Sequence, residues 1–136
     1  MIPLKILLIE DDAIEVMKLR RASRSLKLNP TIIETNNGEE AFKYLKKTNS
    51  LPDIILLDLN MPKINGTEFL RILKADYRLK YIPTIVLTTS NNQRDLLECY
   101  KIGVAGYILK PLKYEVYVSK IEKLLSYWSV NELIKV

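Results

Sequence analysis

Short, continuous apolar runs alternate with longer amphipathic segments along the chain. Runs of this length, rich in Ile, Leu and Val, are typical of strands buried on both faces of a parallel sheet. They predict strands at 4–9, 31–35, 53–57, 84–88 and 106–109. The segments between them predict helices at 13–27, 38–47, 66–75, 93–101 and 113–127. This alternation predicts an α/β fold, a parallel sheet with helices on both faces.

The last predicted helix has the clearest periodicity. Its apolar residues follow helical spacing and form one stripe, made of Tyr114, Tyr117, Val118, Ile121, Leu124, Leu125 and Trp128. Such a stripe is typical of a helix face that packs on a core. Apolar residues continue beyond it, so we assign 1–128 to one domain and 129–136 to a C-terminal tail that takes part in a dimer interface.

Length and composition are those of one globular domain. The chain has 136 residues, of which 48% are hydrophobic and 27% charged. No apolar run approaches the roughly 20 residues of a membrane span, so we expect no membrane partner. The first residues run straight into a strand, which predicts that no signal peptide is present. The single cysteine, Cys99, cannot form an internal disulfide, which favours a cytoplasmic protein.

The net charge of +5 does not predict nucleic-acid binding. Much of the excess positive charge lies on the first predicted helix, which has few aromatic residues beside it. A solvated helix face explains this cluster, and a docking face for a protein partner is the alternative. The basic residues concerned are Lys18, Arg20, Arg21, Arg24 and Lys27.

The chain contains no histidine. This excludes catalytic triads that use histidine as the base, and metal sites with histidine ligands. It also excludes a phosphohistidine on the chain itself, so a phosphoryl group would have to come from another molecule.

Reactive side chains follow four of the predicted strands. Glu10-Asp11-Asp12 follows the first strand, Asp58 the third, Thr88 closes the fourth and Lys110 follows the fifth. Sites in parallel sheets form at the carboxyl ends of strands, so we expect these side chains to meet. Acids, a hydroxyl and an amine together suit a cation and a phosphoryl group carried by an aspartate.

Single residues in this set have simpler interpretations. Asp58 alone could cap the next turn, and Lys110 alone could be an exposed lysine at a strand end. Asp12 competes with Asp11 for a place in the acidic pair, but its position before a helix favours an N-cap. Thr89 competes with Thr88, and strand alternation places the two on opposite faces.

Taken together, the motifs resemble the receiver domain of two-component response regulators. They are the acidic pair, Asp58 followed by Met61-Pro62, Gly66, Thr88 and Lys110-Pro111, in the order and spacing of that family. The resemblance covers residues from about 4 to about 128. It implies a flavodoxin-like, doubly wound sheet of five parallel strands in the order 2-1-3-4-5, with five helices.

The resemblance also implies roles for the site residues. Asp58 would accept the phosphoryl group, and Thr88 and Lys110 would contact it, with Lys110 on Asp58 beforehand. Mg²⁺ would be the cofactor. Its ligands would be Glu10 through water, Asp11, Asp58 and the backbone carbonyl of Asn60. A cis Lys110–Pro111 bond would aim the lysine into the site, and Tyr107 would act with Thr88 as a switch.

The implied function is that of a single-domain response regulator in a phosphorelay, without an output domain. It would receive its phosphoryl group from a sensor histidine kinase or a phosphotransfer protein and act on a downstream protein target. It would catalyse only its own phosphorylation and dephosphorylation, so we do not expect an enzyme in the usual sense. The alternative is a receiver-like interaction module that works without phosphorylation.

Three segments narrow the resemblance to one subgroup of this family. Residues 86–90, residues 100–103 and the pair Tyr127-Trp128 are similar to the single-domain regulators of cyanobacterial phytochrome-type kinases. Gly106 and residues 131–132 depart from that subgroup. With apolar residues left over beside the last helix, we expect a homodimer through the fourth helix, fifth strand, fifth helix and tail. The alternative is a monomer whose tail folds back over its own core.

Overall fold

The computed structural model describes residues 3–61 and 64–134. Pro62 of the Met-Pro motif and the last two residues of the tail lie outside this part. The elements, in chain order, are β1 (Lys5–Ile9), α1 (Ala13–Ser25), β2 (Thr31–Thr35), α2 (Gly38–Lys47), β3 (Ile54–Leu57), α3 (Gly66–Ala75), β4 (Thr84–Thr88), α4 (Gln93–Ile102), β5 (Gly106–Leu109) and α5 (Tyr114–Ser129).

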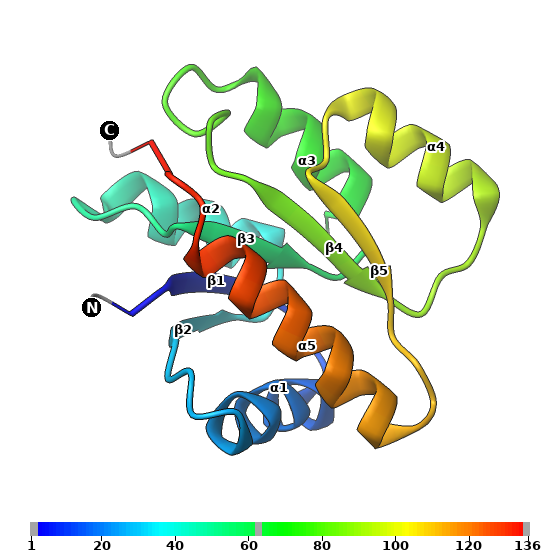
Figure 1. Cartoon of the computed structure of the whole chain (residues 1–136). Coiled ribbons are helices and arrows are strands. Elements are labelled where there is room, and N and C mark those ends of the chain that lie inside the picture. Colours follow the sequence, from blue (N-terminus) through cyan, green and yellow to red (C-terminus); the bar gives the residue numbers. More distant parts are fainter. Residues whose placement is uncertain (1–2, 62–63, 135–136) are drawn as a thin grey trace.

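The strands form one parallel sheet in the order β2-β1-β3-β4-β5. Helices α1 and α5 cover one face, and α2, α3 and α4 cover the other (Figure 1). The predicted α/β fold and strand order are therefore confirmed. Because the connections after β1 and β3 leave toward opposite faces, the neighbouring carboxyl ends of these two strands leave room for a site.

The two helical layers rest on alternate residues of the strands. In β3, Ile54 and Leu56 pack toward α1 and α5, whereas Ile55 and Leu57 pack toward α2, α3 and α4. All four side chains are fully buried. Burial of such a side chain contributes about 1.5–3 kcal/mol, which explains why a short run of Ile and Leu forms the centre of the sheet.

Helix α5 uses its predicted stripe as a core face. Tyr117, Ile121 and Leu125 are buried against α1 and the sheet, and Trp128 packs against the same core. Tyr114, the first residue of the stripe and of the helix, is 37% exposed.

Helix ends differ from the sequence expectation by a few residues. Helix α1 ends at Ser25, two residues early, since Lys27 has φ 57 and Asn29 φ 44, in the left-handed region. Helix α5 continues to Ser129, two residues beyond the expected end. The expected boundary between domain and tail thus falls inside the last turn of α5.

Candidate metal centre at the carboxyl ends of the strands

Three carboxylates meet where β1 and β3 end side by side. The Asp58 N–H donates to the carbonyl of Ile9 at 3.1 Å, which holds the two strand ends together. Carboxylate oxygens of Glu10, Asp11 and Asp58 all lie within 4.8 Å of one another. Glu10 and Asp58 are only 4% and 8% exposed, while Asp11 is open to solvent. Clustered oxygen ligands of this kind suit a hard divalent cation such as Mg²⁺.

Lys110 reaches this cluster from the end of β5. Its Nζ donates to Glu10 Oε1 at 2.6 Å, and both side chains are almost completely buried. The expected contact of the lysine with Asp58 is thus replaced by a bond to Glu10.

The expected cis peptide bond at Lys110–Pro111 is wrong, because the bond is trans. The Lys110 N–H donates to the carbonyl of Thr88 at 2.8 Å, so the residue continues the pairing of β5 with β4. From there the long lysine stem spans to Glu10 without a cis bond, and trans is the intrinsically favoured isomer.

The electrostatics of the cluster show a shortage of positive charge. Burial raises the pKa of Glu10 to about 7, an effect that Lys110 opposes and the charge of Asp58 reinforces. Burial alone would lower the pKa of Lys110, but the hydrogen bond and charge of Glu10, together with Asp58, raise it above its ordinary value. Lys110 is therefore an ammonium group, and one ammonium faces three acids. A cation bound at this place would relieve the remaining repulsion.

Asp12 lies beside the cluster and has a different role. Its Oδ1 accepts a hydrogen bond from the N–H of Ile14 at 2.9 Å, which makes it the N-cap of α1 as predicted. Its own N–H donates to Glu10 Oε2 at 3.3 Å. The carboxylate of Asp12 therefore serves the helix, and Asp11 contributes to the cluster.

Thr88 and Tyr107 lie on the neighbouring strands β4 and β5. Thr88 is fully buried and Thr89 is exposed, which agrees with strand alternation. Tyr107 is half-buried, and its hydroxyl donates to the carbonyl of Ser90 at 2.8 Å. Burial raises the pKa of the Tyr107 hydroxyl, so it is a firm donor at neutral pH.

The connection after β3 passes close to Gly66. A Cβ at this position would lie 2.6 Å from the Cα of Leu59 and 2.9 Å from the carbonyl oxygen of Asp58. The Gly66 N–H donates to the Leu59 carbonyl at 3.1 Å. Glycine is therefore required here for close packing beside Asp58. Asn60 lies in this connection and is exposed.

Asp95 in α4 also lies beside the site, although no motif in the sequence points to it. Its carboxylate accepts a hydrogen bond from the Ser90 hydroxyl at 2.7 Å, next to Thr88. The only signal in the sequence is an acid in the first turn of a helix, which ordinarily indicates no more than favourable helix electrostatics.

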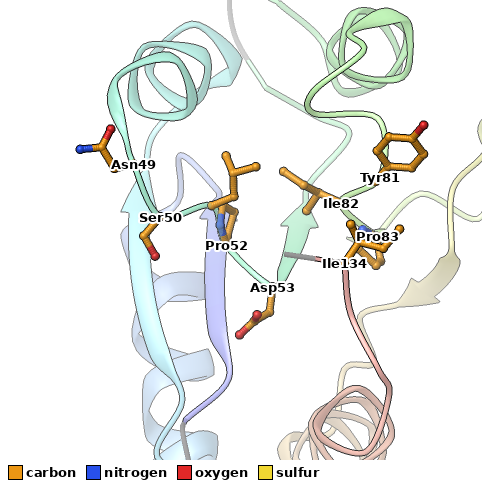
Figure 2. Close-up of a pocket in the computed structure, with 9 residues that line it drawn as sticks. Asn49, Ser50, Pro52, Asp53, Tyr81, Ile82, Pro83 and Ile134 are labelled. Carbon is orange, nitrogen blue, oxygen red and sulfur yellow. The ribbon is translucent and has the colours of Figure 1, made fainter. Parts of the chain in front are cut away.

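The surface is also hollowed at places away from the Glu10, Asp11 and Asp58 cluster. A groove of about 580 Å³ runs between β5 and α5 and includes Tyr107, Tyr127 and Trp128. A pocket of about 190 Å³ lies at the amino ends of β3 and β4, between Pro52 and Pro83, with Ile134 of the tail at its rim (Figure 2). Within residues 3–61 and 64–134, no helix has the length and apolar character needed to cross a membrane.

Comparisons with known proteins agree with this geometry. Residues 6–122 match the family model described as the response regulator receiver domain. The chain is 38% identical to the probable methanogenesis regulatory protein FilR2 of Methanothrix harundinacea, over 93% of this chain and 84% of that protein. It is 30% identical to the response regulator Rcp1 of Synechocystis sp., over 93% and 89%.

Solved structures give the same answer. The phosphorylated cyanobacterial phytochrome response regulator RcpA matches with a TM-score of 0.90 and 32% identity, over 97% of this chain and 99% of that one. The Mn²⁺-bound form of Rcp1 matches with a TM-score of 0.88 and 30% identity, also over 97% and 99%. The chain thus belongs to the response regulator receiver domain family, whose members are signalling proteins that interact with histidine kinases and downstream targets.

Proposed function

We propose that this receiver domain accepts a phosphoryl group on Asp58 in a Mg²⁺-dependent reaction and signals through a conformational change. The observation that carries the proposal is the meeting of Asp58 with Glu10 and Asp11, beside the buried Lys110. Phosphoryl transfer needs a positioned nucleophile and neutralisation of charge on the phosphoryl oxygens, and this arrangement offers both.

In the proposed reaction a carboxylate oxygen of Asp58 attacks the phosphorus atom of a phosphohistidine on a partner kinase or phosphotransfer protein. The P–N bond breaks, and the imidazole leaves with its electron pair. The Thr88 hydroxyl and the Lys110 ammonium take phosphoryl oxygens. For this, Lys110 has to turn away from Glu10. Its hydrogen bond to Glu10 at 2.6 Å is then replaced by a contact with a phosphoryl oxygen.

Glu10, Asp11, Asp58 and the backbone carbonyl of Asn60 would hold the Mg²⁺ ion. When bound, the metal supplies positive charge next to the incoming phosphoryl oxygens. The three clustered carboxylates and the raised pKa of Glu10 support a cation at this place. The related Rcp1 binds Mn²⁺, an ion that also takes oxygen ligands.

The proposed switch joins Thr88 to Tyr107. When the Thr88 hydroxyl moves to a phosphoryl oxygen, the connection that follows β4 shifts, and Tyr107 responds through its bond to the Ser90 carbonyl. Tyr107 borders the groove between β5 and α5, so the change reaches a surface that a downstream protein can contact.

We also propose a homodimer built on α4, β5, α5 and the tail. Leu109, Tyr127 and Val130 are 39%, 59% and 80% exposed on this side of the molecule, which supports an apolar interface. The competing arrangement is a monomer whose tail rests on its own chain, since Ile134 lies beside Pro83 (Figure 2). Light scattering on the full chain and on a chain ending at Val130 separates the two. A monomeric full-length protein, with and without phosphorylation, rules out the dimer.

The phosphoacceptor is tested by incubation with acetyl phosphate, with and without Mg²⁺, followed by intact mass and site mapping. We expect one added phosphoryl group on Asp58, and only with the metal. A phosphoryl group on another residue overturns the assignment. A protein that takes no phosphoryl group from either acetyl phosphate or a histidine kinase supports the interaction module instead.

A further inference from the structure

Every polar atom of Ser90 has a hydrogen-bond partner. Its N–H donates to Thr88 Oγ1 at 3.3 Å, and its carbonyl accepts from the Tyr107 hydroxyl at 2.8 Å. Its hydroxyl donates to Asp95 Oδ2 at 2.7 Å and accepts from the N–H of Asn92 at 3.4 Å. Ser90 therefore connects the end of β4, the ring on β5 and the first turn of α4.

Asp95 is the residue of α4 that takes part in this hydrogen-bond network. It is the third residue of α4, behind the N-cap Asn92, whose side chain accepts from the N–H of Arg94 at 2.8 Å. Of the residues of α4, all of which the structure describes, only Cys99 is fully buried. A helix with so small a buried face depends on polar contacts for its position. The bond from Ser90 to Asp95 supplies one at the end nearest the site.

The Ser90 peptide unit determines what Thr88 and Tyr107 can do. Its N–H fixes one lone pair of the Thr88 hydroxyl, which leaves the hydroxyl hydrogen to point elsewhere. Its carbonyl holds the ring of Tyr107 against the core that α2, α3 and α4 share. If this peptide unit turns, both contacts are lost together. The side chain of the same residue is held by the Asp95 carboxylate.

We propose that Asp95 is a positioning residue of the switch, acting through the Ser90 hydroxyl. It holds the connection between β4 and α4 in the conformation that keeps Tyr107 inward and Thr88 aligned with the site, before a phosphoryl group arrives. The inference deepens the proposed function of Asp58 and rests on it. It adds a residue of α4 that sets the resting balance of the switch.

Three variants separate the bond from the charge. Asp95→Ala removes the acceptor, whereas Asp95→Asn removes the charge and keeps a side-chain oxygen for the Ser90 hydroxyl. Glu68→Ala is the matched control. Glu68 holds the same helix position in α3, three residues after the N-cap Asn65, and its side chain is exposed.

The first measurement needs no phosphorylation. The protein is labelled with 3-fluorotyrosine, Tyr107→Phe assigns the signal, and a gadolinium chelate in the buffer broadens exposed rings. Tyr77, at 84% exposure, and Tyr117, at 1%, mark the two ends of the scale. We expect the Tyr107 signal of Asp95→Ala to broaden more than in the wild type and to approach that of Tyr77. The ratio of inward to outward ring should fall roughly two- to tenfold, which is the effect of one net hydrogen bond. Asp95→Asn should stay near the wild type.

The inference is overturned if Tyr107 broadens in Asp95→Ala no more than in the wild type. It is also overturned if Asp95→Asn matches Asp95→Ala, because the charge would then be responsible, or if Glu68→Ala has the same effect. In a second measurement, acetyl phosphate with Mg²⁺ should label Asp95→Ala more slowly by the same factor. A wild type that takes no phosphoryl group overturns the function proposed for Asp58, and the ring measurement still decides whether Asp95 positions Tyr107.

Discussion

Two aspartates flank β3, and their surroundings differ. Asp53, before the strand, accepts the N–H of Lys5 at 2.7 Å and donates its own N–H to the Lys5 carbonyl at 2.7 Å. Asp58, after the strand, lies with two other carboxylates and is 8% exposed. The first aspartate is matched by its neighbours. The second is held where negative charge accumulates.

The difference follows from the polarity of a parallel sheet. All the strands end at the same edge, so residues that follow different strands converge there, and at β1 and β3 the connections part and leave the space open. At the opposite edge the pocket of Figure 2 is lined by Pro52, Pro83 and Ile134, with Asp53 already bonded. The same residue type thus pairs with the backbone at one end of β3 and joins a carboxylate cluster at the other.

The largest difference should appear when Asp53 and Asp58 are each replaced by asparagine in separate variants. Asp58→Asn removes the proposed nucleophile and should abolish labelling by acetyl phosphate with Mg²⁺. Asp53→Asn keeps an acceptor for Lys5 and should be labelled like the wild type. Intact mass reads both variants in one experiment. Full labelling of Asp58→Asn would place the phosphoacceptor elsewhere and end the comparison.

Two glycines test the packing of the two edges. Gly66→Ala forces a Cβ against Leu59 and the Asp58 carbonyl, so we expect a loss of about 1–3 kcal/mol in unfolding free energy. Gly106→Ala, at the start of β5 on the other edge, meets Ile85 Cγ2 at 3.5 Å, an ordinary contact.

For Gly106→Ala we therefore expect no loss, or a gain of up to about 1 kcal/mol from the less flexible unfolded chain. Urea unfolding measures both variants, and the wild type is the reference. Equal stabilities for the two would contradict the close approach at Gly66.

The smallest effects are expected for the neighbouring acids Asp11 and Asp12, which should differ in their response to Mg²⁺. Mg²⁺ binds the folded state, so it should raise the melting temperature, and Asp11→Ala should lose most of this response. Asp12→Ala should lower stability by about 1 kcal/mol through the lost cap and keep the response to Mg²⁺. Thermal unfolding with and without Mg²⁺ measures this. The reverse result would shift the acidic pair by one residue.

Much of the architecture could be predicted from local patterns. Strands such as β3 are continuous apolar runs, and a stripe such as that of α5 has one helical period, so both are visible in the chain. The predicted ends of the helices were less accurate. The end of α1 depends on the left-handed backbone of Lys27, and lysine carries no signal for that conformation.

The site was predicted as a set of residues, and its contacts were not. The acids and Lys110 are recognised because each follows a strand, and Thr88 because it closes one. That Lys110 meets Glu10 across a trans bond depends on how far a flexible stem extends in the folded chain. The link from Asp95 to Ser90 likewise arises from the orientation of α4 against β4, which its sequence does not encode locally.

By itself, the sequence determined the fold class, the order of the elements and the residues at the strand ends, because hydrophobic period and turn chemistry are local properties. Only the tertiary structure decided which charges pair and which stay together unpaired. Asp53 and Asp58 stand at the two ends of one strand, and each could cap a turn. Their difference arises when β1 and β3 lie side by side, since the free energy of a buried carboxylate depends on the charges and donors that folding places around it.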